Sequence, residues 1–323
     1  MACAGASKAG LELAIVVPCY NEQEVLDTTL RELTLLLDRL IAGGKATAQS
    51  KIVLVDDGSK DNTWSIIRRW TEADDRVAGI KLSRNRGHQN ALLAGLFTAT
   101  GDAIVTIDAD LQDDISAIET MVDELHRGVD VVYGVRRERA SDTPFKRLTA
   151  ESFYMLMRLL GTESIHNHAD FRLMSRRAVE ALKQFGEINL FLRGIVPLIG
   201  LPSSIAYYDR RERFAGTSKY PLRRMLSLAL SAITAFSVVP LRVITATGFV
   251  MFAVTAILSV WVLGVLLFTS SAVPGWASTV LPTYLLGGIQ ILSIGVLGEY
   301  IGRVYGEVKR RPRYIIEDVL NLK

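Results

Sequence analysis

Four aspartates lie within seven residues of the segment VTIDADLQDD, where an apolar run ends. The run predicts a buried strand, so the aspartates follow the end of that strand. Carboxylates this close together repel one another unless a cation lies between them. Mg²⁺ and Mn²⁺ prefer oxygen ligands, and Mg²⁺ commonly binds one or two carboxylates together with substrate phosphates. Asp108 and Asp110 are therefore candidate metal ligands, whereas Asp113 and Asp114 are expected to cap a helix or to lie in a solvated turn.

Two other segments also place polar side chains directly after an apolar run. In LAIVVPCYNE, Tyr20 could stack on a nucleotide base and Glu22 could accept a hydrogen bond from ribose. In KIVLVDDGS, Asp57 could accept a hydrogen bond from a ribose hydroxyl or a base N–H, and Gly58 permits a tight turn. Taken singly, each segment is equally typical of an ordinary loop or of a turn with an Asx cap.

Apolar runs alternate with helical patterns along the N-terminal part of the chain. The runs are continuous, which predicts strands of a mostly parallel α/β sheet covered on both faces. We expect strands within 13–22, 51–57, 77–83, 101–110 and 129–136, and helices within 23–41, 61–70, 84–100 and 114–127. Ligands bind outside the carboxyl ends of such strands. Polar residues follow five strand ends: Tyr20, Asn21, Glu22, Asp56, Asp57, Arg84, Asn85, Arg86, Asp108, Asp110, Arg136 and Arg137.

Composition limits the class of protein. The 37 basic and 34 acidic residues nearly balance, which argues against a general nucleic-acid binder. Two cysteines, Cys3 and Cys19, cannot form a disulfide framework and favour a reducing compartment. Mean hydropathy is +0.25, and the apolar excess lies between Val243 and Gly298, where there is no charged residue or histidine.

This apolar region is long enough for two membrane crossings, because each needs about 20 apolar residues. We expect transmembrane helices at 243–268 and 277–299, with the turn near Pro274. A buried hairpin of a large soluble core is the alternative.

Basic residues flank the apolar region on both sides, in 210–224 and 302–313. Positive flanks favour the cytoplasmic side of a membrane, so the prediction is an integral membrane protein whose main domain and both termini are cytoplasmic. The expected organisation is an α/β domain at 1–210, a basic and amphipathic segment at 211–242, a two-helix hairpin at 243–299 and a basic tail at 300–323.

The motifs taken in order resemble a known family. VVPCYNE, VLVDDGSKDNT, LSRNRGHQNALLAGL and VTIDADLQDD are similar to the inverting glycosyltransferases of family two, which have a GT-A (Rossmann-like) fold. VVYGVRRER, DFRLMSRRAV and RRERFAGTSKYPL extend the resemblance to polyprenyl-phosphate glycosyltransferases, among them the bactoprenol glucosyltransferases and dolichyl-phosphate mannose synthase. The resemblance covers nearly the whole chain.

The resemblance implies roles for particular residues. Donor nucleoside binding falls to Pro18, Tyr20, Glu22 and Asp57, and the metal and diphosphate motif to Asp108, Asp110 and Gln112. Arg136 would face the donor diphosphate, and Arg213 and Lys219 would bind the acceptor phosphate. With Asp110 and Arg136, Asp170 completes the predicted catalytic set as a candidate base or a partner of Arg172. Its alternatives are a structural buried carboxylate and a zinc site with His166 and His168.

The resemblance also implies a reaction. One hexose would move from a nucleotide sugar, with UDP-glucose favoured, to undecaprenyl phosphate, with Mg²⁺ or Mn²⁺ as cofactor. UDP-GlcNAc, UDP-galactose and GDP-mannose are alternative donors, and a tetramer in a bacterial inner membrane is the implied assembly. A Gln-x-x-Arg-Trp motif of polymer synthases is not found. Competing hypotheses are a nucleotidyltransferase and a non-catalytic membrane scaffold that retains the fold.

Overall fold

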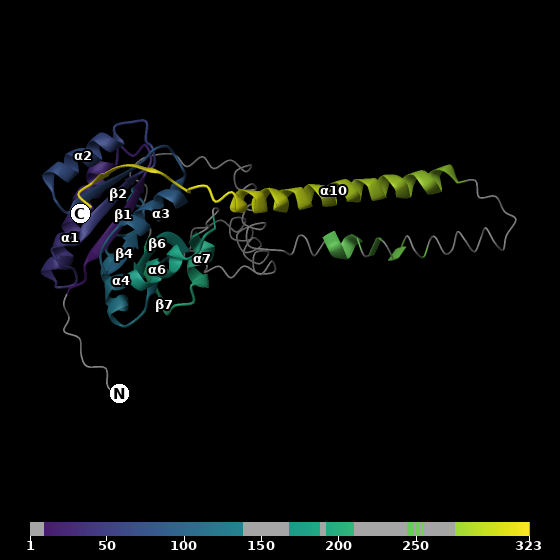
Figure 1. Cartoon of the computed structure of the whole chain (residues 1–323). Coiled ribbons are helices and arrows are strands. Elements are labelled where there is room, and N and C mark those ends of the chain that lie inside the picture. Colours follow the sequence, from purple (N-terminus) through teal and green to yellow (C-terminus); the bar gives the residue numbers. More distant parts are fainter. Residues whose placement is uncertain are drawn as a thin grey trace. The chain divides into compact units, whose positions relative to one another are not determined.

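The computed structural model describes residues 10–137, 168–187, 192–209 and 275–322, together with short pieces between 244 and 257. Within these residues the chain forms an eight-stranded sheet in the order β7-β5-β6-β4-β1-β2-β3-β8 (Figure 1). The strands are β1 (Leu13–Cys19), β2 (Lys51–Asp56), β3 (Val77–Leu82), β4 (Ala103–Thr106), β5 (Val131–Arg136), β6 (His168–Ser175), β7 (Ser203–Tyr208) and β8 (Ile316–Leu320).

The centre of the sheet is parallel, as the continuous apolar runs predict. β1 pairs in parallel with both β2 and β4, and β2 pairs in parallel with β3. Every residue of β1 is buried. The carboxyl ends of these strands therefore meet at one edge of the sheet, and this edge carries the predicted site.

Helices cover both faces of the sheet (Figure 1). Leucines of α1 (Leu26–Ala42) share one core cluster with Leu13, Ile15 and Val17 of β1. Residues of α2 (Thr63–Ala73) and α4 (Ala117–His126) belong to the same cluster. On the opposite face, α3 (His88–Thr98) packs against Val16 of β1 and neighbours α6 (Arg176–Lys183).

Strand β6 enters the sheet between β4 and β5 and is antiparallel to both. Its first residues therefore lie at the same edge as the carboxyl ends of the parallel strands. Sequence reasoning did not assign this strand. The consequence is that Asp170, near its start, lies beside residues that follow β4. The short helix α7 (Leu192–Leu198) contacts the same strand.

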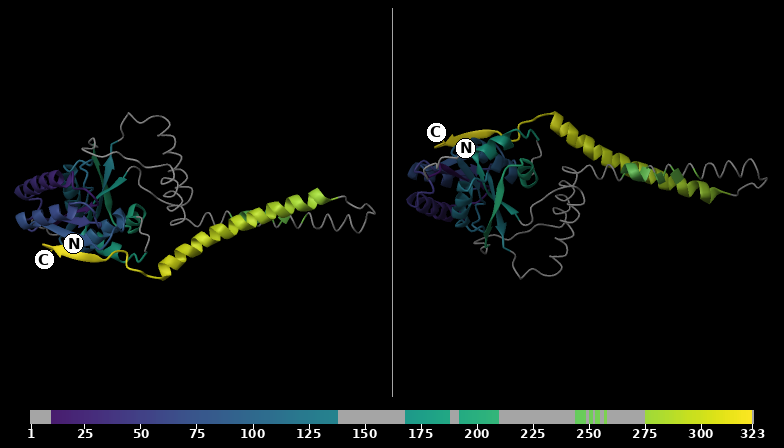
Figure 2. Two further views of the ribbon diagram at one scale, coloured as in Figure 1. Left: turned by 90° about the horizontal axis from the view of Figure 1, so that it is seen from above. Right: turned by 90° about the horizontal axis from the view of Figure 1, so that it is seen from below.

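The C-terminal residues complete the sheet. β8 pairs antiparallel with β3. In both views of Figure 2, β8 is the yellow arrow next to the label C. Lys81 on β3 forms an ion pair of 3.0 Å with Glu317, and Asn321 donates to the carbonyl of Thr71 at 2.6 Å. The segment 300–323, expected to be only a basic tail, thus ends in a strand.

Two compact units make up the chain. The first contains the sheet with its helices and includes residues 311–323, and most of the second consists of residues 221–310. The second unit contains the 33-residue helix α10 (Trp276–Val308).

The prediction of an integral membrane protein is contradicted. In the part of the chain that the structure describes, no helix combines the length and the apolar character that a membrane crossing requires. Most of the first expected span, 243–268, lies outside the described residues, and the second, 277–299, falls within α10.

Packing of α3 on the sheet requires a glycine at position 95. A Cβ there would lie 2.2 Å from Cγ1 of Val16, so we expect Gly95→Ala to lower the free energy of unfolding by about 1–3 kcal/mol through overpacking. Gly186→Ala is the matched control, because its Cβ would meet no atom within 4 Å. Urea denaturation of the two variants measures the difference; equal stabilities would contradict the close packing of α3 on β1.

Candidate active site

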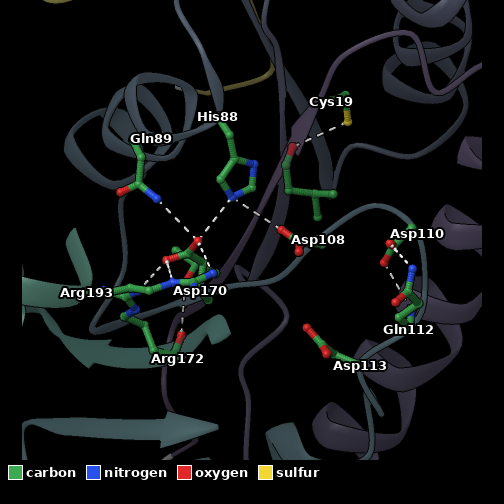
Figure 3. Close-up of polar contacts among 12 residues, drawn as sticks. Cys19, His88, Gln89, Asp108, Asp110, Gln112, Asp113, Asp170, Arg172 and Arg193 are labelled. Atoms are coloured by element: carbon green, nitrogen blue, oxygen red, sulfur yellow. Dashed lines mark hydrogen bonds and ion pairs between the residues drawn. The ribbon is translucent and has the colours of Figure 1, made fainter. Parts of the chain in front are cut away.

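The candidate site lies at the carboxyl edge of the parallel strands (Figure 3). Asp108 and Asp110 follow β4, Asp170 and Arg172 lie on β6, and His88 begins α3. The sheet topology thus brings together side chains that are far apart in the sequence.

Asp170 is the most heavily contacted carboxylate of this edge. Its Oδ1 accepts hydrogen bonds from Arg172 Nη2 at 2.7 Å and Arg193 Nε at 3.3 Å. Its Oδ2 accepts from Arg193 Nη2 at 3.1 Å and Gln89 Nε2 at 3.3 Å, and His88 Nε2 lies 3.5 Å away. Burial alone would raise the pKa of Asp170, but the hydrogen bond from His88 and the charges of Arg172 and Arg193 hold it well below its usual range. Asp170 is therefore a carboxylate at neutral pH.

His88 links Asp170 to Asp108. Its Nε2 lies 3.5 Å from Oδ1 of Asp108 as well as from Oδ2 of Asp170. Burial would lower the pKa of His88, but the hydrogen bond to Asp170 and the charge of Asp108 raise it. The imidazolium form of His88 is thus favoured by both carboxylates.

Asp108, like Asp56 and Asp113, has a buried carboxylate oxygen without a hydrogen bond among the described residues. In Asp108 this atom is Oδ1. Burial raises the pKa of Asp108 to about 6; the charge of His88 opposes this, and the charges of Asp113, Asp170 and Asp110 add to it. A cation beside Asp108 would reverse this cost, because it favours the ionised form.

Asp110 is hydrogen-bonded to Gln112 and not to His88. Gln112 donates its side-chain amide to Oδ2 of Asp110 at 2.5 Å and its backbone N–H to Oδ1 at 3.2 Å. Leu111 between them has a φ of 52°, a left-handed conformation that is strained for a leucine. In Figure 3 the Asp110–Gln112 pair lies apart from Asp170, with Asp108 between them. In the described part of the chain, no cluster of three or more His, Cys, Asp or Glu side chains could hold a metal by itself.

Arg136, which is half-buried, contacts the buried side chains of Asp113 and Tyr208. Arg136 Nη2 lies 3.1 Å from Oδ1 of Asp113, Arg136 Nε donates to the Tyr208 hydroxyl at 3.0 Å, and that hydroxyl donates to Asp113 at 2.6 Å. The expectation that Asp113 lies in a solvated turn or caps a helix is therefore wrong, because its side chain is buried against a cation. Asp114 does accept a hydrogen bond from the backbone N–H of Ser116, near the start of α4.

The loop after β1 is bound to the loop after β2. Thr63 Oγ1 accepts from the backbone N–H of Glu22 at 2.9 Å, and Ser59 Oγ accepts from that of Asn21 at 3.0 Å. Tyr20 is exposed next to them, whereas Pro18 is buried within β1. The ring of Tyr20 is thus exposed at this loop, which the loop after β2 holds by its backbone.

Asp57 organises a neighbouring loop. Both of its buried carboxylate oxygens accept backbone N–H groups, from Arg86 at 2.6 Å and Gly87 at 2.8 Å. Gly58 has a φ of +67°, and a Cβ there would lie 2.6 Å from the backbone of Arg84. Asp57 therefore fixes the loop that leads into His88, a contact that the nucleoside-binding prediction did not foresee.

The structure does not describe every predicted site residue. Arg213, Lys219 and His166, the last from the zinc alternative, lie outside the described residues. His168 pairs with Val135 in the sheet.

Sequence reasoning missed His88, Gln89 and Arg193. A signal existed for His88 and Gln89, because RNRGHQN follows the third predicted strand, although the prediction included only Arg84, Asn85 and Arg86 of that segment. Arg193 gave no such signal: it lies on the short α7, and only the tertiary fold brings it to Asp170.

The mostly parallel sheet with acidic residues after β4 defines an α/β fold of the GT-A type. The sequence pattern of the family described as glycosyl transferase family 2 matches residues 14–183, and the chain belongs to this family.

Relatives match almost the whole chain. An uncharacterised glycosyltransferase of Bacillus subtilis, YkoT, is 51% identical over 308 residues, covering 94% of this chain and 91% of that protein. A prophage bactoprenol glucosyl transferase homolog of Escherichia coli K12 is 42% identical, covering 96% and 99%. The bactoprenol glucosyl transferase of Shigella phage SfII is 40% identical, covering 95% and 98%.

The raised pKa of Asp108 predicts a pH-dependent cost in stability. A carboxyl group whose pKa is raised on folding to about 6 destabilises the protein progressively as pH rises from its unfolded value toward 6. We therefore expect Asp108→Asn to raise Tm at pH 7.5 in EDTA and to lose most of this advantage at pH 4.5. The gain is on the order of 1 kcal/mol, or about 2–4 °C, since the side chain is 39% exposed and solvent screens it.

Thermal unfolding of the parent and the variant at both pH values measures this effect. Asp114→Asn on the same loop is the control, because Asn caps as well as Asp does. A stabilisation by Asp108→Asn of equal size at both pH values would contradict a raised pKa for Asp108.

Proposed function

We propose that the protein transfers one hexose, with inversion, from a nucleotide diphosphate sugar to a polyprenyl monophosphate. UDP-glucose is the favoured donor, so the transferred sugar is glucose. The observation that carries the proposal is the acidic edge of the sheet, in a chain that relatives named bactoprenol glucosyl transferase match over 95–96% of its length. These names support a lipid phosphate acceptor and glucose.

The donor is assigned to the loops after β1, β2 and β4. Tyr20 and Glu22 would contact the nucleoside with Pro18 beneath them, and Asp57 would act by holding the loop before His88. A divalent cation, Mg²⁺ or Mn²⁺, would be held by Asp108 and Asp110 together with phosphate oxygens of the donor. Oδ1 of Asp108 is buried and has no hydrogen bond among the described residues, although His88 lies 3.5 Å away, and this supports the assignment. Such a cation neutralises charge on a departing diphosphate.

Arg136 is assigned to the departing diphosphate. Asp113 and Tyr208 fix its guanidinium, while a third of its side chain stays exposed. A hydrogen-bonding guanidinium that is oriented before the reaction stabilises developing negative charge without having to reorganise. Gln112 supports the same region by orienting Asp110.

The acceptor phosphate needs little activation. Its second pKa is about 6, so much of it is dianionic at neutral pH. The protein therefore has mainly to position the phosphate and to offset its charge. Arg213 and Lys219 are proposed acceptor ligands, on the resemblance of their segment alone.

Purified protein incubated with radiolabelled UDP-glucose, undecaprenyl phosphate and Mn²⁺ tests the proposal. We expect label in the lipid phase, its loss in EDTA, and a fall of about 100-fold or more in Asp110→Ala, on the scale of losing an electrostatic stabiliser. Asp114→Asn, on the same loop, should transfer normally. Undiminished transfer by Asp110→Ala would reject the assigned site.

A donor panel separates the remaining possibilities. UDP-GlcNAc, UDP-galactose and GDP-mannose replace UDP-glucose in the same assay. Preference for one of them would change the sugar but keep the reaction. Transfer from none of the four donors would reject the reaction and favour a non-catalytic role.

A further inference from the structure

The contacts of Asp170 leave no lone pair of its carboxylate available to act as a general base. Five nitrogen atoms, from Arg172, Arg193, Gln89 and His88, surround its two oxygens at 2.7–3.5 Å. A carboxylate offers about four lone-pair sites, so these donors saturate it. A base must also reach the proton that it removes, and Asp170 is only 5% exposed. The contacts of Asp170 are instead those of a group that orients cations.

The two arginines that contact Asp170 differ in exposure. Arg172 is 1% exposed, and its ion pair of 2.7 Å with Asp170 lies inside the protein. Arg193 is 42% exposed, and only its Nε and Nη2 contact Asp170. The carboxylates that act on both arginines are Asp170 and Asp108. His88 adds a third cation to this group, so positive charge exceeds negative charge. Arg193 therefore presents excess positive charge and an N–H-bearing edge toward solvent, which suits a phosphate.

The position of Arg193 is fixed by further contacts at the start of α7. Gln89 Oε1 accepts the backbone N–H of Leu192 at 3.1 Å, while its Nε2 donates to Asp170. Arg172 Nη1 donates to the carbonyl of Leu192 at 3.4 Å. Asp170 and its partners thus hold both the backbone before Arg193 and its side chain, an arrangement with no evident use if Arg193 were an ordinary surface residue.

The location separates this cation from the donor side. In Figure 3, Asp108 lies between Asp170 and the Asp110–Gln112 pair, and Asp113, the partner of Arg136, also lies away from Asp170. In an inverting displacement, the nucleophile and the leaving group lie on opposite faces of the sugar. Arg193 beside Asp170 and Arg136 beside Asp113 are therefore candidate cations for two different phosphates.

We propose that Arg193 binds the phosphate of the acceptor, and that Asp170 is a positioning residue that orients Arg193. This inference rests on the proposed function. The dianionic phosphate oxygen forms the bond to the anomeric carbon, and the carbon–oxygen bond to the donor diphosphate breaks. The electron pair leaves with the nucleoside diphosphate, so no proton has to be removed and Asp170 stays ionised throughout.

Steady-state kinetics with UDP-glucose and farnesyl phosphate, a short polyprenyl monophosphate, test Arg193. We expect Arg193→Ala to raise KM for farnesyl phosphate about 10- to 100-fold, the loss of a charged hydrogen bond, with KM for UDP-glucose little changed. Added guanidinium should restore part of the activity of Arg193→Ala, and Arg193→Lys should be intermediate. Arg177→Ala, an exposed arginine of α6 paired with Asp130, is the control and should behave as the parent.

The role of Asp170 is tested with two variants, the single variant Asp170→Asn and the double variant Asp170→Asn with Arg193→Ala. The same steady-state kinetics are measured for both. A positioning role predicts a raised KM for farnesyl phosphate, an unchanged shape of the pH profile of kcat, and a double variant no worse than Arg193→Ala. A general-base role of Asp170 predicts a lower kcat and loss of the acidic limb of the pH profile. It also predicts that the kinetic effects of the two substitutions add in the double variant. These results would overturn the proposal. If Asp170→Asn does not fold, guanidinium rescue and the Arg193→Lys variant still decide the role of Arg193.

Direct binding distinguishes failure of this inference from failure of the proposed function. Titration calorimetry measures farnesyl phosphate binding to the full chain, independently of sugar transfer. Binding that depends on Arg193 without transfer from any donor would reject the function and keep the phosphate site. Transfer by Arg193→Ala with parental KM values, or a raised KM for UDP-glucose alone, would overturn the inference.

Discussion

The arrangement of the site depends on a single buried carboxylate. Asp170 accepts hydrogen bonds from β6, α3 and α7, and so connects three elements that are remote in the sequence. Removing one partner from a buried, paired charge is costly because the remaining charge is left without compensation. The positions of His88, Gln89 and Arg193 are therefore interdependent. The loop before His88 adds to this order, since Asp57 holds it by two backbone N–H groups.

Opposite charges are distributed over the edge in two groups. Asp170 is surrounded by cations, whereas Asp108 has His88 on one side and acidic neighbours on the other. Asp110 is bonded to Gln112. Arg136 provides a cation near the second group, restrained by Asp113 and Tyr208. This division gives the edge a cationic side and an acidic side, which matches a reaction between one phosphate compound and another that reaches the protein with a metal ion.

Much of the fold follows from local patterns in the sequence. Continuous apolar runs predicted β1 to β5, and the leucine spacing of α1 predicted its buried face, because burial on one or both sides leaves a periodic signal. β6, β7 and β8 were missed. β6 and β8 pair with strands distant in the sequence, and β7 and β8 are partly exposed edge strands without a continuous apolar run. Asp108 and Asp110 stood out by their spacing. The burial of Asp113 and the approach of Arg193 depend on tertiary contacts that no local pattern encodes.

The pairing of β8 with β3 determines when the sheet can be completed during synthesis of the chain. Residues 221–310 leave the ribosome after most of the sheet and before its last strand. Until residues 316–320 emerge, β3 is an open edge strand with unpaired backbone groups, a state that favours pairing with other chains. The nascent chain thus remains prone to association through β3 until residues 316–320 have been translated and have paired with it.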